Sequence, residues 1–333
     1  MRVRCIPAKA LAVDLVQKWT ILQRGNRLLS SPFFCPEYTS AIAGARDDVF
    51  IGILEEDNEV VGLFPFQRVK RVAGLPIGWP MCDYQGLIAG PETDWNPEEL
   101  LRGCRLVAWD FDHLIVSQPA FRPFIRQRRQ SWILNLATGY ESYAQGKIQS
   151  GSRLVERIDR QVRRLQRNVG PVRFEPRVAD HAVLDQMLVW WAEKWTKGER
   201  VGRWTSAVLH KVLETRTDGF AGMLSALYAG DELLALDFGM RTQSVWHSWF
   251  PAYNRQFARY SPGAVLLMKI AEAAPSFGIK VLDLGPGESP YKLRLANDSI
   301  VIAEGSVAAF PLVAGARVAI RALRAVRRRL MFG

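Results

Sequence analysis

The second half of the chain alternates short apolar runs with turn residues, a pattern typical of strands in a meander followed by mixed elements. The helix in this half has the clearest start, because Ser261 is a favourable N-cap and Pro262 a favourable first helical residue. The predicted elements are strands at 223–228, 233–240 and 244–250, a helix from 261 to about 278, a strand at 280–284, a helix at 291–296 and a hairpin over 299–308.

The first half of the chain repeats this order more loosely. Its predicted elements are strands at 49–54 and 59–69 around a turn, a helix at 97–108, and strands at 113–117 and 131–136. The strands at 113 and 280 stand almost half the chain apart, which indicates two copies of one α/β unit. A length of 333 residues agrees with two domains.

A basic helix is predicted between the two halves, over 152–168. Leu154, Ile158, Val162 and Leu165 lie on its apolar stripe, and arginine occupies many of the other positions. This surface is either a solvated helix face or an anion-facing surface beside an active site. The tail, 310–333, is also basic with helical spacing, so it either docks on the protein or contacts an anionic membrane leaflet.

Composition narrows the class of protein. The chain is 48% hydrophobic, which excludes wholesale disorder, and its formal net charge of +11 favours phosphorylated ligands, nucleic acid or an anionic membrane surface. The four cysteines lack metal-ligand spacing, so we expect reduced thiols and no metal. No apolar run reaches the length of a membrane span and no signal peptide is recognisable, so we expect a cytoplasmic protein.

Two arginines precede the helix predicted to begin at Ser261. The free N–H groups and the positive dipole end of a helix N-terminus favour an anion, and Arg255 and Arg259 add positive charge there. This segment therefore predicts a site for a phosphate-bearing ligand.

The later segment, 283–292, places Asp283 at a strand end and Tyr291 and Lys292 at a helix start. Ligands usually bind at such strand ends in α/β sheets. Together the two segments resemble the GNAT-type acetyltransferases of the CelD/BioF2-like group, which is related to the FemAB peptidoglycan aminoacyltransferases and is often associated with exopolysaccharide synthesis. The residues that carry the resemblance are Tyr253, Arg259-Tyr260-Ser261-Pro262-Gly263 with Leu266-Leu267, Asp283-Leu284-Gly285, Gly287-Glu288 and Tyr291-Lys292.

The resemblance implies an α/β (α+β) fold of tandem GNAT-like, FemAB-like mixed sheets flanked by helices. Its implied domains are a degenerate GNAT-like copy at 1–145, a catalytic GNAT domain at 146–310 and a basic tail at 311–333. It further implies that acetyl-CoA or another acyl-CoA is the co-substrate and that its pyrophosphate lies at the helix start. The residues implied in binding it are Arg255, Arg259, Tyr260, Ser261 and Gly263.

The same resemblance assigns roles on the later segment. Tyr291 would protonate the leaving thiolate, and Lys292 resembles a FemAB lysine at the acyl-transfer site. The chain departs from the usual GNAT pyrophosphate signature at Ser261–Gly263, so aminoacyl-tRNA stays open as an alternative acyl carrier.

The general base has several candidates. If Arg241-Thr242-Gln243 is the turn between two strands, Asp237 faces His247 and a carboxylate orients an imidazole. Asp283 is a rival base. The alternatives are a histidine packed in the core and an aspartate that caps its strand.

Four tryptophans, Trp190, Trp191, Trp195 and Trp204, precede the catalytic unit. They are either core residues or a platform for a sugar, and 198–203 between them is a candidate lid.

We therefore expect an acyl-CoA-dependent N- or O-acyltransferase. Its expected acceptor is a small molecule or glycan, namely an amino sugar or polysaccharide precursor. The alternatives are a FemAB-type transferase that uses aminoacyl-tRNA, the one nucleic-acid partner left open, and a catalytically weak scaffold at the inner face of the membrane.

Overall fold

The computed structural model describes residues 1–194, 203–313 and 315. The chain forms two compact units, and these are interleaved along the sequence. Unit 1 comprises Met1–Leu29, Ile42–Arg129 and the described part of Val301–Gly333, and unit 2 comprises Ser30–Ala41 and Gln130–Ile300. The domains expected from the sequence are consecutive instead, and the boundary expected at 145 falls inside helix α4, Tyr140–Gln149. Most of the predicted tail, and the candidate lid, lie outside the described residues.

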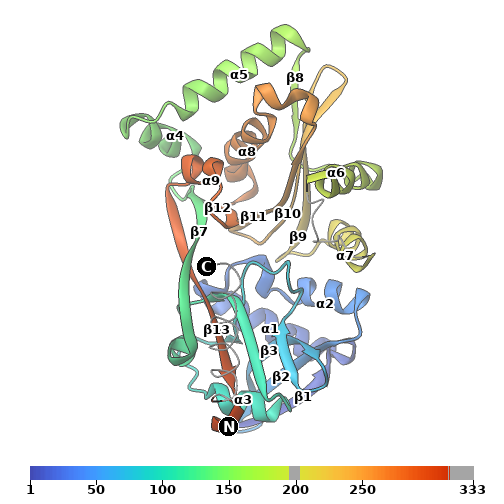
Figure 1. Ribbon diagram of the computed structural model, residues 1–333, viewed down its shortest axis with the longest axis vertical. Coiled ribbons are helices and arrows are strands. Elements are labelled where there is room, and N and C mark those ends of the chain that lie inside the picture. Colours follow the sequence, from blue (N-terminus) through green and yellow to red (C-terminus); the bar gives the residue numbers. More distant parts are fainter. Residues whose placement is uncertain (195–202, 314, 316–333) are drawn as a thin grey trace, which may run out of the picture. The chain divides into compact units, whose positions relative to one another are not determined.

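Unit 1 contains a mixed sheet with the strand order β1-β2-β3-β4-β6-β13, and β5 pairs with β3 (Figure 1). Helix α1 packs against β3 and β5, and α3 packs against β1 and β2. The elements are β1 (Arg2–Pro7), α1 (Val13–Gly25), β2 (Val49–Glu56), β3 (Glu59–Val69), β4 (Ala73–Pro76), β5 (Ile88–Ala89), α3 (Pro97–Gly103), β6 (Ala108–Ile115) and β13 (Asp298–Ala308), and α2 (Pro36–Ala45) spans the division between the units.

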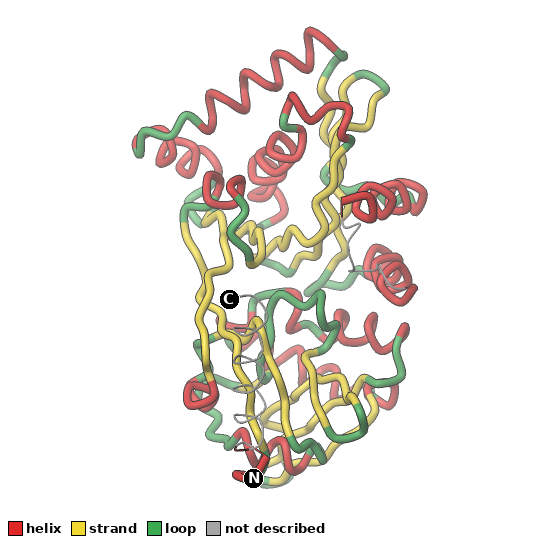
Figure 2. The backbone as a smooth tube through the Cα atoms, viewed as in Figure 1, coloured by secondary structure: helices red, strands yellow, loops and turns green. Residues whose placement is uncertain are grey.

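Unit 2 contains a sheet with the strand order β7-β12-β11-β10-β9-β8, in which β11 and β12 are parallel neighbours. Helices α5 and α8 lie on one face of β9–β11, and α6 and α7 lie on the other (Figures 1 and 2). Besides α4, the elements are β7 (Ile125–Asn135), α5 (Leu154–Asn168), β8 (Val172–Glu175), α6 (His181–Lys194), α7 (Arg203–Glu214), β9 (Ala221–Ala229), β10 (Glu232–Arg241), β11 (Val245–Tyr253), α8 (Pro262–Ala273), β12 (Val281–Pro286) and α9 (Pro290–Leu295).

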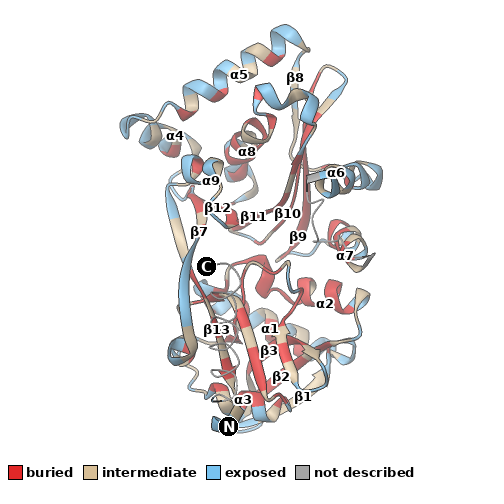
Figure 3. Ribbon diagram, viewed as in Figure 1, coloured by how far each residue is buried: buried red, intermediate tan, exposed pale blue. Residues whose placement is uncertain are grey.

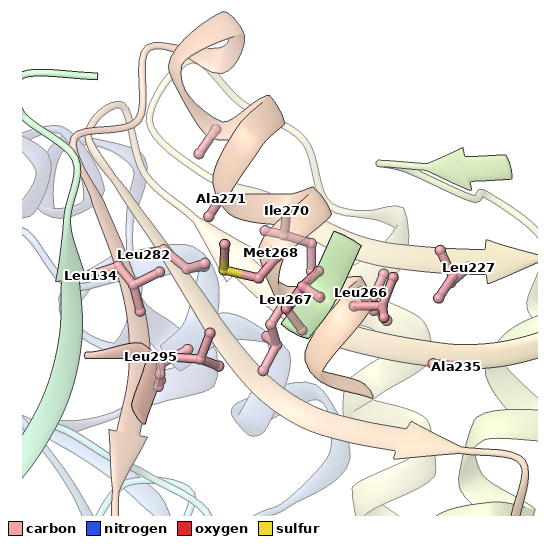
Figure 4. Close-up of a cluster of buried hydrophobic side chains, with 14 of the residues drawn as sticks. Leu134, Leu227, Ala235, Leu266, Leu267, Met268, Ile270, Ala271, Leu282 and Leu295 are labelled. Carbon is pink, nitrogen blue, oxygen red and sulfur yellow. The ribbon is translucent and has the colours of Figure 1, made fainter. Parts of the chain in front are cut away.

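Helix α8 fills the core on its face of this sheet. Its residues Leu266, Leu267 and Ile270 are buried against apolar residues of β9, β10 and β12 (Figure 4). Helix α5 instead buries only Leu154, Ile158 and Leu165, and its other residues are largely exposed (Figure 3). The predicted amphipathic stripe of α5 is therefore confirmed.

Most predicted elements of unit 2 are confirmed, and two other elements are corrected. The predicted hairpin over 299–308 is wrong, since Asp298–Ala308 is one strand. A Cβ on Gly305 would lie 2.2 Å from the Phe124 carbonyl oxygen, so this glycine permits close packing and does not form a turn. The helix predicted at 97–108 ends at Gly103, and β6 begins at Ala108.

A membrane-spanning helix is not found among residues 1–194, 203–313 and 315. In the same part of the chain, no group of His, Cys, Asp and Glu side chains is arranged to hold a metal ion.

Candidate active site

A cavity of about 290 Å³ lies in unit 2 at the start of α8. Five elements form it: α5, the end of β11, the 3-10 helix Arg255–Tyr260, the start of α8, and α9. The lining residues are Leu154, Arg157, Ile158, Gln161, Pro251, Tyr253, Ala258, Ser261, Pro262, Gly263, Ala264, Leu267, Tyr291, Arg294 and Leu295. The cavity thus combines an apolar floor with a helix N-terminus and two arginines.

The N-terminus of α8 has an unusual cap. Ser261 adopts the left-handed conformation with φ 52°, and no side-chain oxygen caps the helix there. Pro262 has no N–H, and the N–H groups of Ala264 and Val265 donate to the Ser261 carbonyl. Because the helix dipole makes this end positive and Ser261 and Gly263 line the cavity, the first turn of α8 is suited to an anion.

Arg157 and Arg294 supply the positive side chains of the cavity lining, and their role is one that the sequence did not single out. Arg157 lies on the basic helix α5, for which an anion-facing surface was one of the two interpretations. Arg294 lies one helical turn after Tyr291 on α9, and that spacing is the signal that could have identified it.

The two arginines expected at the helix start lie outside the cavity lining. Arg255 Nη2 donates to the Glu193 carbonyl at 3.1 Å, and the guanidinium of Arg259 lies 4.9 Å from the centre of the Tyr260 ring. Tyr260 is buried in the core, and its hydroxyl accepts a hydrogen bond from Asn168 at 3.4 Å. Of the five residues expected to bind the acyl donor, Ser261 and Gly263 therefore line the cavity.

Strands β11 and β12 pair over only three residues. Their parallel pairing joins Val245 to Val281, Trp246 to Leu282 and His247 to Asp283, and β11 then continues to Tyr253 beyond this pairing. The parallel pairing therefore ends at the His247–Asp283 step.

The β10–β11 pair has a different register from the predicted one and contains a one-residue irregularity. Phe238 pairs with Phe250 and Gly239 with Ser248, so Trp249 is the extra residue of a bulge. Asp237 lies opposite Pro251, and the predicted pairing of Asp237 with His247 is wrong, because Arg241 already pairs with Trp246 and the turn is therefore not Arg241-Thr242-Gln243.

His247 lies beside Asp283 across the parallel pair. Its Nδ1 lies 3.4 Å from Asp283 Oδ1, and both side chains are buried. Asp283 also accepts a hydrogen bond from the Gly285 N–H at 2.8 Å, and the edge of the Phe33 ring packs on the imidazole. The carboxylate–imidazole pair expected from the sequence therefore exists, with a different carboxylate.

Asp237 forms its own buried pair with Ser248, whose hydroxyl donates to Asp237 Oδ1 at 2.5 Å. Burial raises the pKa of Asp237 to about 7, against the lowering effects of the Ser248 hydrogen bond and the charges of His247 and Lys292. A carboxyl group with this pKa can both accept and donate a proton near neutral pH. Ser248 was not a sequence candidate, because the predicted register did not place it beside Asp237.

Tyr291 and Lys292 are consecutive on α9 and have different surroundings. Tyr291 lines the cavity, whereas Lys292 Nζ donates to the Gly285 and Pro286 carbonyls at 3.2 and 2.6 Å. Lys292 therefore holds the end of β12, and its charge acts on Asp237. Among the tryptophans, Trp191 packs edge-on against Phe250, and Trp195 lies outside the described residues.

Comparisons with known proteins identify a matching domain family and similar folds. Residues 152–293 match the family model described as acetyltransferase (GNAT) domain. The chain is similar in structure to the C-terminal (DUF2156) domain of a putative lysylphosphatidylglycerol synthetase from Agrobacterium fabrum, with a TM-score of 0.57 and 13% identity, covering 92% of this chain and 94% of that chain. It is also similar to FemX, with a TM-score of 0.56 and 10% identity over 87% of this chain and 94% of that chain.

A tandem GNAT protein from the clavulanic acid biosynthesis pathway is a further structural relative. Its TM-score is 0.51 and its identity 10%, and the match covers 93% of this chain and 99% of that chain. No curated protein matches the chain by sequence. The chain therefore has the α/β fold of tandem GNAT proteins, contains a GNAT-type acetyltransferase domain at 152–293 and is an acyltransferase.

Proposed function

We propose that this acyltransferase moves an acyl group from acyl-CoA to an amine or hydroxyl group of an amino sugar or polysaccharide precursor. The observation that carries the donor half of this proposal is the cavity at the start of α8. There an uncapped helix N-terminus and the side chains of Arg157 and Arg294 converge within the acetyltransferase domain.

The cavity supports a donor with both phosphate and apolar parts. Phosphate oxygens accept hydrogen bonds from helix N–H groups and from guanidinium groups, which Gly263, Arg157 and Arg294 would supply. The apolar floor of Leu154, Leu267 and neighbouring residues would take the less polar part of the donor.

The chemistry requires proton removal from the acceptor and proton delivery to the leaving thiolate. The acceptor attacks the thioester carbonyl, the C–S bond then breaks, and no covalent enzyme intermediate forms. The candidate bases are Asp237 and the His247–Asp283 pair, whose side chains are buried and lie outside the cavity lining. Tyr291, in the cavity lining, would protonate the thiolate, and Lys292 would hold the strand end beside it.

A FemAB-type reaction is the alternative. The observation that favours it is the structural likeness to FemX and to the lysylphosphatidylglycerol synthetase domain, together with the exposed arginines of α5. In that case the acyl carrier is aminoacyl-tRNA, and α5 supplies contacts to its phosphates. Contact with the inner face of a membrane remains a further proposal, based on the basic tail in the sequence.

Ligand-induced stabilisation tests the donor. Acetyl-CoA at a hundredfold excess over its dissociation constant should stabilise the protein by about 2.7 kcal/mol. Arg157→Ala and Arg294→Ala should each weaken binding about tenfold, because each removes a charged hydrogen-bond donor from the cavity.

Arg160→Ala is the matched control for this experiment. Arg160 lies on the same helix as Arg157, is exposed and pairs with Glu156, so its loss should leave acetyl-CoA binding unchanged. If neither acetyl-CoA nor longer acyl-CoAs stabilise the protein and the protein binds charged tRNA, the acyl-CoA proposal is wrong and the aminoacyl-tRNA alternative is supported.

A further inference from the structure

Two cysteines of unit 1 come together where β1 meets the end of α3. Cys5 lies in β1, the first strand of its sheet, and is partly exposed, whereas Cys104 directly follows α3 and is fully buried. The proposed acyl-transfer chemistry uses neither of them.

Strand pairing defines how close the two thiols are. Cys5 lies directly opposite Gly52 of β2. A Cβ on Gly52 would lie only 2.4 Å from Cys104 Sγ, so the sulfur of Cys104 occupies the space that a side chain opposite Cys5 would fill. Because side chains on directly opposed antiparallel residues are in contact, Cys104 Sγ is a neighbour of the Cys5 side chain.

Arg68 of β3 holds both cysteines. Its Nη2 donates to Cys5 Sγ at 3.4 Å and to the Cys104 carbonyl at 2.9 Å. The guanidinium is itself fixed, since it lies 3.9 Å from the centre of the Phe50 ring. A permanent positive charge is therefore positioned against the sulfur of Cys5.

The surroundings make the two thiols unequal. A hydrogen bond from Cys104 and the charges of Arg68 and Arg105 lower the pKa of Cys5 to about 7, although burial opposes this. The hydrogen bond to Cys5 and burial raise the pKa of Cys104. Cys5 therefore loses its proton more readily than Cys104. A partly exposed thiolate beside a positive charge is the reactive form of cysteine.

We propose that Cys5 and Cys104 form a peroxide-reactive dithiol, with Cys5 as the nucleophile and Cys104 as the resolving thiol. The Cys5 thiolate attacks one oxygen of hydrogen peroxide, the O–O bond breaks, and the released hydroxide takes a proton to become water. This leaves a sulfenic acid on Cys5.

The Cys104 sulfur then attacks the Cys5 sulfur, the S–O bond breaks, and the hydroxide leaves as water with the proton of Cys104. One peroxide is reduced to two waters, and the two thiols are oxidised to one disulfide. The bond links β1 to the end of α3, and a dithiol reductant reverses it.

Mass spectrometry of the full chain tests this proposal. After exposure to hydrogen peroxide, the folded protein should lose the mass of two hydrogens, and a non-reducing digest should yield a peptide pair joined through Cys5 and Cys104. Dithiothreitol should restore the original mass. An unchanged protein mass at peroxide concentrations that oxidise a thioredoxin-type dithiol would overturn the proposal. A disulfide bond that involves Cys35 or Cys82 would overturn it as well.

Variants separate the two roles. Cys104→Ala should leave a sulfenic acid on Cys5 that dimedone traps, Cys5→Ala should remove the trapped species, and Arg68→Gln should slow oxidation about tenfold. Cys35→Ala and Cys82→Ala are the controls and should oxidise like the parent. Thermal melts establish that each variant is folded, and the peptide pair in the unaltered protein decides the outcome if Cys104→Ala does not fold.

Discussion

The buried carboxyl of Asp237 makes the stability of the protein depend on pH. Its pKa is raised from 3.8 to about 7, so the folded state favours the protonated form. The resulting cost to folding is absent below about pH 4, grows as pH rises, and is complete above about pH 7, where it reaches roughly 4 kcal/mol.

Asp237→Asn should remove this pH dependence. Near about pH 8 the variant should have a higher free energy of unfolding than the parent, and this advantage should shrink as pH falls toward about 5, because Asn carries no charge to bury. Urea unfolding at a series of pH values measures the effect. Asp231→Asn, in the exposed turn before β10, is the control, and an equal pH dependence in parent and Asp237→Asn would contradict the assignment.

At the scale of single residues, the structure brings two of the candidate site residues together. His247, Asp283 and Asp237 were all candidates, and the structure brings the first two to 3.4 Å. Ser248, the partner of Asp237, was not foreseen, since the predicted register of the two strands was wrong. Arg255 and Arg259 are near the cavity in sequence, but their side chains extend to Glu193 and Tyr260.

The bulge at Trp249 is the feature of β11 that shapes the site, and Gly239 makes it possible. A Cβ on Gly239 would lie 2.1 Å from the His247 carbonyl oxygen, so the two backbones approach where no side chain fits.

Gly239→Ala should therefore lower the free energy of unfolding by about 2–4 kcal/mol, because the backbone at the bulge must move. Chemical denaturation monitored by tryptophan fluorescence measures this. Gly263→Ala is the comparison: its Cβ would meet only Tyr253 Cδ1 at 3.8 Å, so unfolding should change little while acetyl-CoA binding weakens at the altered cavity wall. A Gly239→Ala protein as stable as the parent would show that the bulge does not depend on the glycine.

Elements with local signals were predictable, and those set by distant packing were not. The start of α8 at Ser261-Pro262 and the apolar stripe of α5 were predicted from a few neighbouring residues, although the Ser261 side chain does not cap the helix as expected. The bulge and the single strand β13 depend on contacts with other strands, which local patterns do not contain.

At the scale of the whole molecule, unit 2 incorporates the segment Ser30–Ala41 from the first half of the chain. Phe33 and Tyr38 are buried there, and their rings pack edge-on against Trp249. Two similar copies in tandem were predicted from the sequence. The inclusion of Ser30–Ala41 in unit 2 was not predicted, because the apolar residues of this segment look like those of any other core segment.

Phe33→Ala should destabilise the full chain by about 3–5 kcal/mol, since it removes a buried ring from beside both Trp249 and His247. Leu28→Ala, at a side chain that is mostly exposed, should cost far less. Equilibrium unfolding in urea compares the two, and equal losses would mean that the segment contributes little to unit 2.

The same segment sets an order of events during protein synthesis. Phe33, Phe34 and Tyr38 leave the ribosome long before Trp249, so their packing site has not been synthesised while the first half of the chain emerges. Throughout that interval the nascent chain exposes three large aromatic side chains to water, and other nascent chains can bind them. Chaperones that hold apolar segments on the ribosome should therefore raise the soluble yield of this protein, and rapid overproduction without them should direct it into aggregates.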